Sequence, residues 1–246
     1  MIETPVEIKT PDGVAGGFLY QPAPRGKWPG VIHLTDIFGV RPAQQRMAGQ
    51  LCEAGYVVLM PNIFYRTGLP PIFDRPYDPK DEYIIKRIGE LRASLPPDAM
   101  TRDASAYVDF LAQQPAVAGA KFGAVGYCFA GAMALRITAA FPEKIGAAAS
   151  FHGGGLFTGA PDSPHTVLPR VKARLYFGHA VDDRSMSAEA IAKFEAALAA
   201  WGGKYESETY SGCLHGWTTL DSAVYNPEGA ARAFSKLTAL FSAALS

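Results

Sequence analysis

Hydrophobic and polar positions along the chain follow two periods, one typical of strands and the other of helices. Short apolar runs, together with one alternating segment near the end, predict strands at 31–35, 56–60, 121–126, 145–150, 173–177 and 204–210. In longer segments the apolar residues recur every three or four positions. These segments predict helices over 43–54, around 84–91, from 101 to 111, over 129–141, over 187–201 and from 227 past 241.

Capping residues mark the ends of several of these helices. Thr101 and Ser187 are expected to cap the starts of two of them, because their hydroxyl oxygens accept from free backbone amides. Gly202-Gly203 is expected to end the second, since glycine adopts the left-handed conformation of a helix end. Asn226-Pro227 is a favourable cap and first-turn pair for the last helix.

The order of the elements predicts an α/β fold. Residues 4–9 and 14–20, joined by Pro11-Asp12-Gly13, predict an N-terminal hairpin, and the Pro-rich stretch 62–80 is expected to be irregular. After the hairpin, strands alternate with helices, which is typical of a mostly parallel sheet with helices on both faces. We therefore expect residues 1–246 to form a single domain, with its site in the loops that follow the strands.

Composition narrows the class of protein. The 246 residues carry 23 basic and 23 acidic side chains, whereas a nucleic-acid-binding protein usually has a basic excess. No segment reaches the roughly 18 consecutive apolar residues of a membrane span, and the N-terminus lacks the pattern of a signal peptide. Three cysteines, with no CxxC pair, favour free thiols in a reducing compartment. We expect a cytoplasmic monomer that binds neither nucleic acid nor membrane.

Cys128 lies where a predicted strand meets a predicted helix. The run Gly126-Tyr127-Cys128-Phe129-Ala130 has the G-x-S-x-G pattern of a nucleophile elbow, with cysteine in place of serine and alanine in place of the last glycine. A thiol at the start of a helix is favoured as the thiolate. A buried, inert cysteine in an Ala-rich core is the alternative, and the hexapeptide alone does not decide between them.

Chain order favours the catalytic interpretation. In α/β-hydrolases the nucleophile is followed by the acid and then the histidine. Asp182 and Asp183 follow the strand at 173–177, and His215 lies in a glycine-bounded loop after the last strand. Both loops are expected at the same edge of the sheet as Cys128, so these residues are candidates for the acid and the base.

The other four histidines have alternative interpretations. His33 lies within a strand, where a hydrogen-bonded core histidine is expected, and His165 lies in a Pro-rich loop. His179 precedes the acid loop. His152 begins an HGGG run that is similar to the oxyanion loop of lipases, but that loop precedes the nucleophile and this one follows it. We expect residues 152–155 to form a turn that lines the pocket.

Several motifs together resemble the dienelactone hydrolase family, the carboxymethylenebutenolidase-like branch of the α/β-hydrolases, over nearly the whole chain. The matching segments are LTDIFGVRP (34–42), GYVVLMPNIFYRTG (55–68), GYCFAGAMA (126–134), YFGHAVDDRSM (176–186) and HGW (215–217). The resemblance implies an α/β-hydrolase fold and a triad of Cys128, His215 and Asp183, with Asp183 rather than Asp182 chosen by its spacing before Met186.

The resemblance also implies roles for residues of the early loop. The family has a carboxylate, usually glutamate, that interacts with the cysteine and is coupled to its activation. Asp36 holds that position and is one methylene shorter, so it either activates Cys128 or only orders the loop. The backbone N–H groups of Phe129 and Ile37 are expected to hold the oxyanion.

These residues imply a thiol-dependent hydrolase of a small lactone or ester, which needs no metal and no cofactor. Arg66 and Trp217 are candidate substrate contacts. Two other functions stay open: a redox-sensing thiol in which Cys128 pairs with Cys52 or Cys213, and a binding module that has kept the fold.

The charge of the substrate is also open. Family members that cleave dienelactone bind a substrate carboxylate with an arginine shortly after the histidine, whereas here the run after His215 ends in Asp221 without an arginine. Either the substrate is neutral, which the sequence favours, or Arg66 or Arg75 supplies the positive charge.

Overall fold

The strands pair into one sheet in the computed structural model, which describes residues 1–23, 26–75, 77–78 and 80–245. The sheet order is β1-β2-β4-β3-β5-β6-β7-β8; β1–β2 and β2–β4 pair antiparallel and every other pair is parallel. The strands are β1 Ile2–Thr10, β2 Gly13–Gln21, β3 Trp28–Leu34, β4 Val57–Pro61, β5 Val117–Tyr127, β6 Ile145–Phe151, β7 Arg174–His179 and β8 Tyr205–Thr209. The predicted hairpin is β1–β2, and each predicted strand is present.

Helices connect the strands as the periodicity predicts. They are α1 Pro42–Glu53, α2 Glu82–Ala93, α3 Pro97–Ala112, α4 Ala130–Ala140, α5 Ala188–Trp201 and α6 Pro227–Ala244, with a 3₁₀ helix η1 at Pro164–Arg170. The side chains of Ser187 and Asn226 accept from amides in the first turns of α5 and α6, and Gly202 ends α5 with φ 69°. These caps confirm the predicted boundaries.

The predicted cap at Thr101 is wrong. Helix α3 begins at Pro97, one turn earlier, with Pro96 as its N-cap. Proline is favourable in the first turn because it lacks the N–H that would otherwise be unsatisfied. Thr101 lies inside the helix, where its hydroxyl donates to the carbonyl of Pro97. Within the irregular stretch 62–80, residues 76 and 79 lie outside the described residues.

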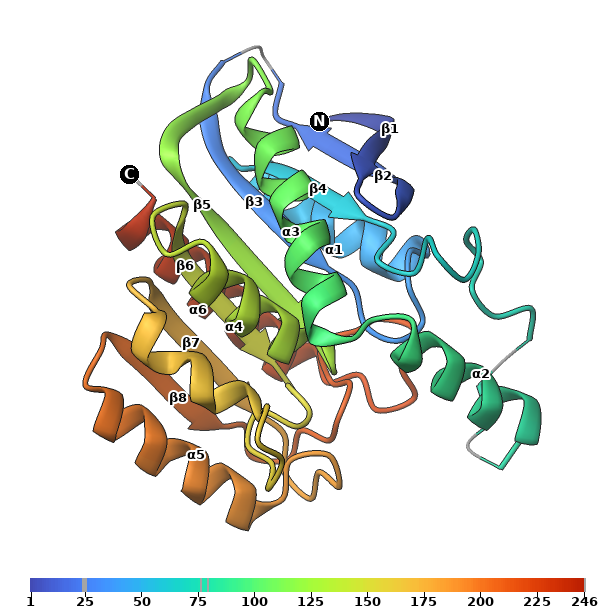
Figure 1. Cartoon of the computed structure of the whole chain (residues 1–246), viewed down its shortest axis with the longest axis vertical. Helices are drawn as coiled ribbons and strands as arrows, with labels where there is room; N and C mark the ends of the chain where they lie inside the picture. Colours follow the sequence, from blue (N-terminus) through green and yellow to red (C-terminus); the bar gives the residue numbers. More distant parts are fainter. Residues whose placement is uncertain (24–25, 76, 79, 246) are drawn as a thin grey trace.

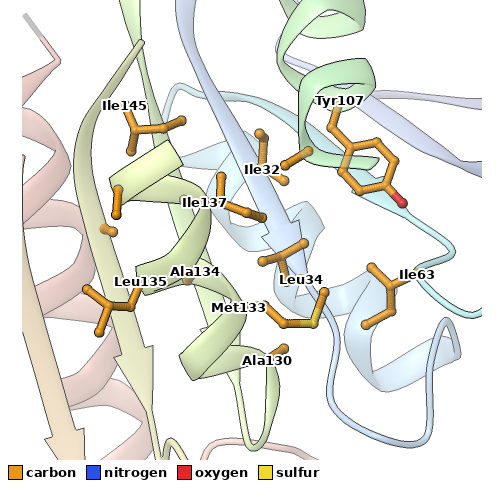
Figure 2. Packing of buried hydrophobic residues seen from close by; sticks show 14 of the residues in the cluster. Ile32, Leu34, Ile63, Tyr107, Ala130, Met133, Ala134, Leu135, Ile137 and Ile145 are labelled. Carbon is orange, nitrogen blue, oxygen red and sulfur yellow. The ribbon is translucent and has the colours of Figure 1, made fainter. Parts of the chain in front are cut away.

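Two helical layers cover the sheet. Helices α1 and α6 lie on one face, and α3, α4 and α5 lie on the other (Figure 1). Figure 2 shows the second layer, where Ile32 and Leu34 of β3 lie beside Met133 and Ile137 of α4. Each such fully buried side chain contributes about 1.5–3 kcal/mol of transfer free energy. Among the described residues, none of the helices has the length and apolarity that a membrane span requires.

One edge of the sheet is the expected place for a functional site. The parallel strands β3, β5, β6, β7 and β8 all end at that edge, and the loops that follow them meet there.

Candidate active site

Cys128 is the turn residue between β5 and α4. Its backbone has φ 57°, a left-handed conformation that is uncommon for a residue with a side chain. The close approach of strand and helix requires Gly126, since a Cβ there would lie 2.0 Å from the carbonyl oxygen of Ala130. Ala130 itself is buried, and its methyl group fits where the elbow pattern has glycine. The sharp turn therefore follows directly from the residue types at 126–130.

His215 lies between Cys128 and Asp183. Its Nε2 is 3.0 Å from the Sγ of Cys128, and its Nδ1 is 2.6 Å from Oδ2 of Asp183. The other oxygen of Asp183 accepts from the N–H of Ser185 at 2.8 Å and from its hydroxyl at 2.6 Å. Three loops that are far apart in sequence thus bring a thiol, an imidazole and a carboxylate into one line of hydrogen bonds.

The comparison with known proteins identifies the family of this chain. Residues 15–245 match the family model described as the dienelactone hydrolase family. The chain belongs to the dienelactone hydrolase family. The family match makes it a carboxylic ester hydrolase that acts on a small molecule and confirms the α/β-hydrolase fold expected from the sequence.

Individual relatives agree with this family. A Synechocystis sp. protein assigned as a carboxymethylenebutenolidase is 28% identical over 228 residues, which cover 92% of this chain and 90% of that protein. The carboxymethylenebutenolidase of Rhodococcus opacus is 28% identical over 216 residues, covering 84% of this chain and 77% of that enzyme. The crystal structure of a Klebsiella pneumoniae protein assigned to the dienelactone hydrolases has a TM-score of 0.87 at 20% identity, covering 98% of each chain.

The electrostatics of this dienelactone hydrolase family site favour a charged histidine. Burial opposes the charge on His215, but the hydrogen bonds to Asp183 and Cys128 outweigh it and raise the pKa of His215 to about 10. Burial works against the ionised form of Asp183 as well, yet its hydrogen bonds to His215 and Ser185 lower the pKa of that carboxyl. The pair is therefore arranged to hold an imidazolium against a carboxylate.

The two neighbouring aspartates differ sharply in environment. Asp183 is 7% exposed and faces His215, whereas Asp182 is exposed and has φ 49°. The left-handed backbone at Asp182 turns the chain so that only the second carboxylate faces inward.

Asp36 binds an arginine rather than the thiol. The guanidinium of Arg41 donates to both carboxylate oxygens, at 2.6 and 2.9 Å, and Gln44 and the N–H of Phe38 donate to the same group. Among the described residues no hydrogen bond joins Asp36 to Cys128. The expected contact is therefore not made here, and the interpretation in which Asp36 orders its loop accounts for all of these bonds.

Arg41 also reaches the histidine loop. Its Nε lies 2.7 Å from Oδ2 of Asp221, and its Nη2 lies 3.1 Å from Oδ1. Arg41 thus joins the loop after β3 to the loop that carries His215. No role was predicted for Arg41 from the sequence, although it lies in the LTDIFGVRP segment (34–42) that resembles the family.

The predicted substrate contacts have other partners. Both terminal nitrogens of Arg66 donate to carboxylates, one to Asp103 and the other to Asp103 and Asp12. This guanidinium is therefore already paired with two carboxylates, and its role in substrate binding stays a prediction. Arg75 pairs with Asp74 and stacks on the ring of Tyr83.

Trp217 is corrected as a substrate contact. It is completely buried, with its ring stacked on Tyr210 at 4.8 Å and edge-on to His152 at 5.0 Å. Trp217 supports the histidine loop from within the core, where a substrate does not reach it.

The remaining histidines lie as follows. His33 is buried and bonded through Nε2 to Gln44, as expected for a core histidine; burial lowers its pKa to about 4. His165 bonds to Ser163, and His179 bonds to Ser207. His152 is 1% exposed and so does not line an open pocket; it lies directly behind Cys128.

Two backbone amides at the site are free. Within the part of the chain that the structure describes, neither the N–H of Ile37 nor that of Phe129 donates to a protein acceptor. Aromatic side chains belong to the same two loops: the ring of Phe129 stacks on that of Phe64 at 5.7 Å, and the ring of Phe38 lies 5.4 Å from that of Phe73. The described residues contain no group of three or more metal-ligating side chains.

Proposed function

We propose that this protein hydrolyses a small lactone or carboxylic ester through a thioester on Cys128. His215 removes the proton of the Cys128 thiol, and Asp183 orients and stabilises the resulting imidazolium. The thiolate attacks the carbonyl carbon, and the C–O bond breaks as His215 returns the proton to the leaving oxygen. Water, deprotonated by His215, then attacks the thioester, which releases the acid and restores the thiol.

The amides of Ile37 and Phe129 are the proposed donors to the oxyanion. Both lack a protein acceptor among the residues that the structure describes, and Phe129 directly follows the nucleophile, where hydrolases of this fold have one such donor. Their two loops lie at the same sheet edge because β3 and β5 are adjacent and parallel.

One observation carries this proposal: His215 is within hydrogen-bond distance of both Cys128, at 3.0 Å, and Asp183, at 2.6 Å, at a strained elbow. The test is turnover of p-nitrophenyl acetate by the wild type and by Cys128→Ala. Loss of turnover in a folded Cys128→Ala protein supports the mechanism. Full turnover in that variant would overturn it.

We further propose that the substrate is neutral. Arg41 lies between Asp36 and Asp221, so this cluster of three side chains carries a net negative charge. A substrate carboxylate there would compete with two protein carboxylates for one guanidinium. The half-buried aromatic rings of Phe129 and Phe38 favour an apolar acyl or alcohol group instead.

The three cysteine thiols also bear on the cellular compartment and on the redox-sensor alternative. Cys52, Cys128 and Cys213 are all free, which suits a reducing compartment, and we keep the cytoplasmic monomer as our proposal. Burial raises the pKa of Cys52 to about 11 and raises the pKa of Cys213 as well. Both buried thiols are poor resolving partners for Cys128, so nothing here favours a redox sensor.

A further inference from the structure

The turn at His152–Gly155 contacts all three loops that carry the proposed triad. It follows β6, whose last residue, Phe151, pairs beside Tyr127 at the end of β5. We call residues 152–155 the brace turn. The sequence suggested that this HGGG run lines the pocket, but its histidine is buried behind the nucleophile.

The brace turn holds the backbone of Cys128 on both sides. The N–H of Cys128 points to Nδ1 of His152 at 3.1 Å and to the carbonyl of Phe151 at 3.1 Å. The carbonyl of Cys128 accepts from the N–H of Gly154 at 3.2 Å and from that of Gly131 at 3.0 Å. The brace turn therefore bonds to both polar backbone groups of Cys128, together with Phe151 of β6 and Gly131 of α4.

The hydrogen bonds to the Cys128 carbonyl also set the direction of the Phe129 N–H. In a trans peptide the carbonyl of Cys128 and the N–H of Phe129 point in opposite directions in one plane. Because the carbonyl is held toward Gly154 and Gly131, the N–H of Phe129 is held away from them. That amide is one of the two proposed oxyanion donors.

Gly155 and the ring of His152 contact the loops that carry Asp183 and His215. The N–H of Gly155 donates to the carbonyl of Ser185 at 2.8 Å, and Ser185 holds Asp183. Nε2 of His152 lies 2.8 Å from the hydroxyl of Thr218, three residues beyond His215. The rings of His152 and His215 meet edge to face, with centroids 5.1 Å apart.

These contacts fix the tautomer of His152. Nδ1 faces an N–H and must be unprotonated, so the proton is on Nε2 and is donated to Thr218. Burial lowers the pKa of His152 well below its usual value, and the nearby charge of His215 lowers it further. The ring stays neutral beside an imidazolium, and its lone pair is always available to Cys128.

We propose that His152 is a positioning residue for ester hydrolysis, which acts through the Cys128 backbone to align the Phe129 amide with the oxyanion. This inference rests on the proposed function. His152 has φ 42°, a conformation that this ring-bearing residue adopts at a cost and glycine adopts freely. The two hydrogen bonds of the ring stabilise the residue in this conformation.

The test uses His152→Gly, which keeps the backbone conformation and removes the ring. Ester turnover needs the oxyanion donors, whereas alkylation of Cys128 by iodoacetamide needs only the thiolate. We expect kcat for p-nitrophenyl acetate to fall about 10–100-fold with KM within about twofold. The alkylation rate and its pH profile should stay close to those of the wild type. If His152 only supported folding, His152→Gly would lower ester turnover and Cys128 alkylation together.

A second, milder variant tests the same role in case His152→Gly does not fold. Thr218→Val removes the acceptor for Nε2–H without changing the shape of the side chain. Nδ1 keeps its lone pair, but the ring loses one of its two hydrogen bonds, so its bond to the N–H of Cys128 is held less firmly. We expect about a 3–10-fold fall in kcat, again without loss of alkylation. Wild-type kcat in both folded variants, or a kcat that falls only in step with alkylation, would overturn the role of His152. Failure of the mechanism itself would appear separately, as activity retained in Cys128→Ala.

Discussion

Cys128 and His215 are 87 residues apart in sequence, yet the thiol sulfur and the imidazole Nε2 lie 3.0 Å apart. That distance is short enough for the proton to pass directly from one to the other. The elbow holds the thiol at the start of α4, and the loop after β8 holds the ring above it.

Cys128→Ala should abolish ester hydrolysis while the fold is kept, because the elbow accepts a small side chain. We expect a loss of at least about 10³-fold in kcat, the scale seen when a triad nucleophile is removed. Steady-state turnover of p-nitrophenyl acetate and far-ultraviolet circular dichroism check the two halves of this statement.

The same experiment has an internal control in the other thiols. Iodoacetamide should label Cys128 well before Cys52, which is buried and whose pKa burial raises to about 11. Faster labelling of Cys52, measured by peptide mass spectrometry, would contradict the assignment of the nucleophile.

Asp183→Asn should cost about 10²–10⁴ in kcat, because an amide favours the wrong tautomer of His215. Asp182→Asn provides the matched control: it removes the same charge one residue away, from an exposed side chain, and should cost less than about twofold. The two kcat values, measured side by side, decide the assignment, and a reversed order would show that Asp182 is the acid.

Much of this site could be predicted from the sequence because it depends on local patterns and on chain order. The elbow needs small residues at 126 and 130, and the acid and histidine must follow the next strands of a parallel sheet. The boundaries of α5 and α6 were predicted by caps that act over three residues. Each of these signals lies within a few residues of the feature that it marks.

Contacts between distant loops could not be predicted in this way. Arg41 and Asp221 are 180 residues apart in sequence, and their pairing depends on how two loops meet above the finished sheet. Arg66 was predicted to contact the substrate because the sequence does not show that Asp103, in the second turn of α3, faces it. His152 was placed in the pocket because its φ of 42°, which turns the ring inward, has no sequence signal other than the glycines after it.

Stability should depend on pH through His215. Its pKa is about 10 in the folded protein and near 6.5 when unfolded, so the folded state binds the extra proton between these values. The stabilisation is complete below about pH 6.5 and is lost as the pH rises toward about 10. We expect the free energy of unfolding to fall over this range in the wild type and to fall less in His215→Gln. Urea denaturation at several pH values measures both slopes, and equal slopes would refute the raised pKa.

Asp36→Asn tests whether that carboxylate acts on the thiol or on the loop. In the structure it binds Arg41 and Gln44, so we expect a loss of about 1–3 kcal/mol in stability. The pH profile of Cys128 alkylation should be unchanged. A shifted profile would show that Asp36 is coupled to Cys128 and restore the role that the family resemblance implies.

The last prediction concerns the charge of the substrate. Arg41 already donates to Asp36 and Asp221, and a third carboxylate beside them would be poorly paired, which is costly near a partly buried site. We therefore expect the methyl ester of a carboxylated lactone to be hydrolysed with a higher kcat/KM than the free acid. The two compounds differ only in the charge at a position away from the reacting carbonyl.

A preference of tenfold or more for the acid, about 1.4 kcal/mol, would contradict this expectation. Two variants would then locate the cation. Loss of that preference in Arg41→Met would mean that the substrate displaces Asp221 or Asp36 from the guanidinium. Arg66→Met is the matched control, because Arg66 is bound to Asp103 and Asp12 in the same way but belongs to the loop after β4. An acid preference that survives both variants would place the anion site on other residues and remove Arg41 from substrate recognition.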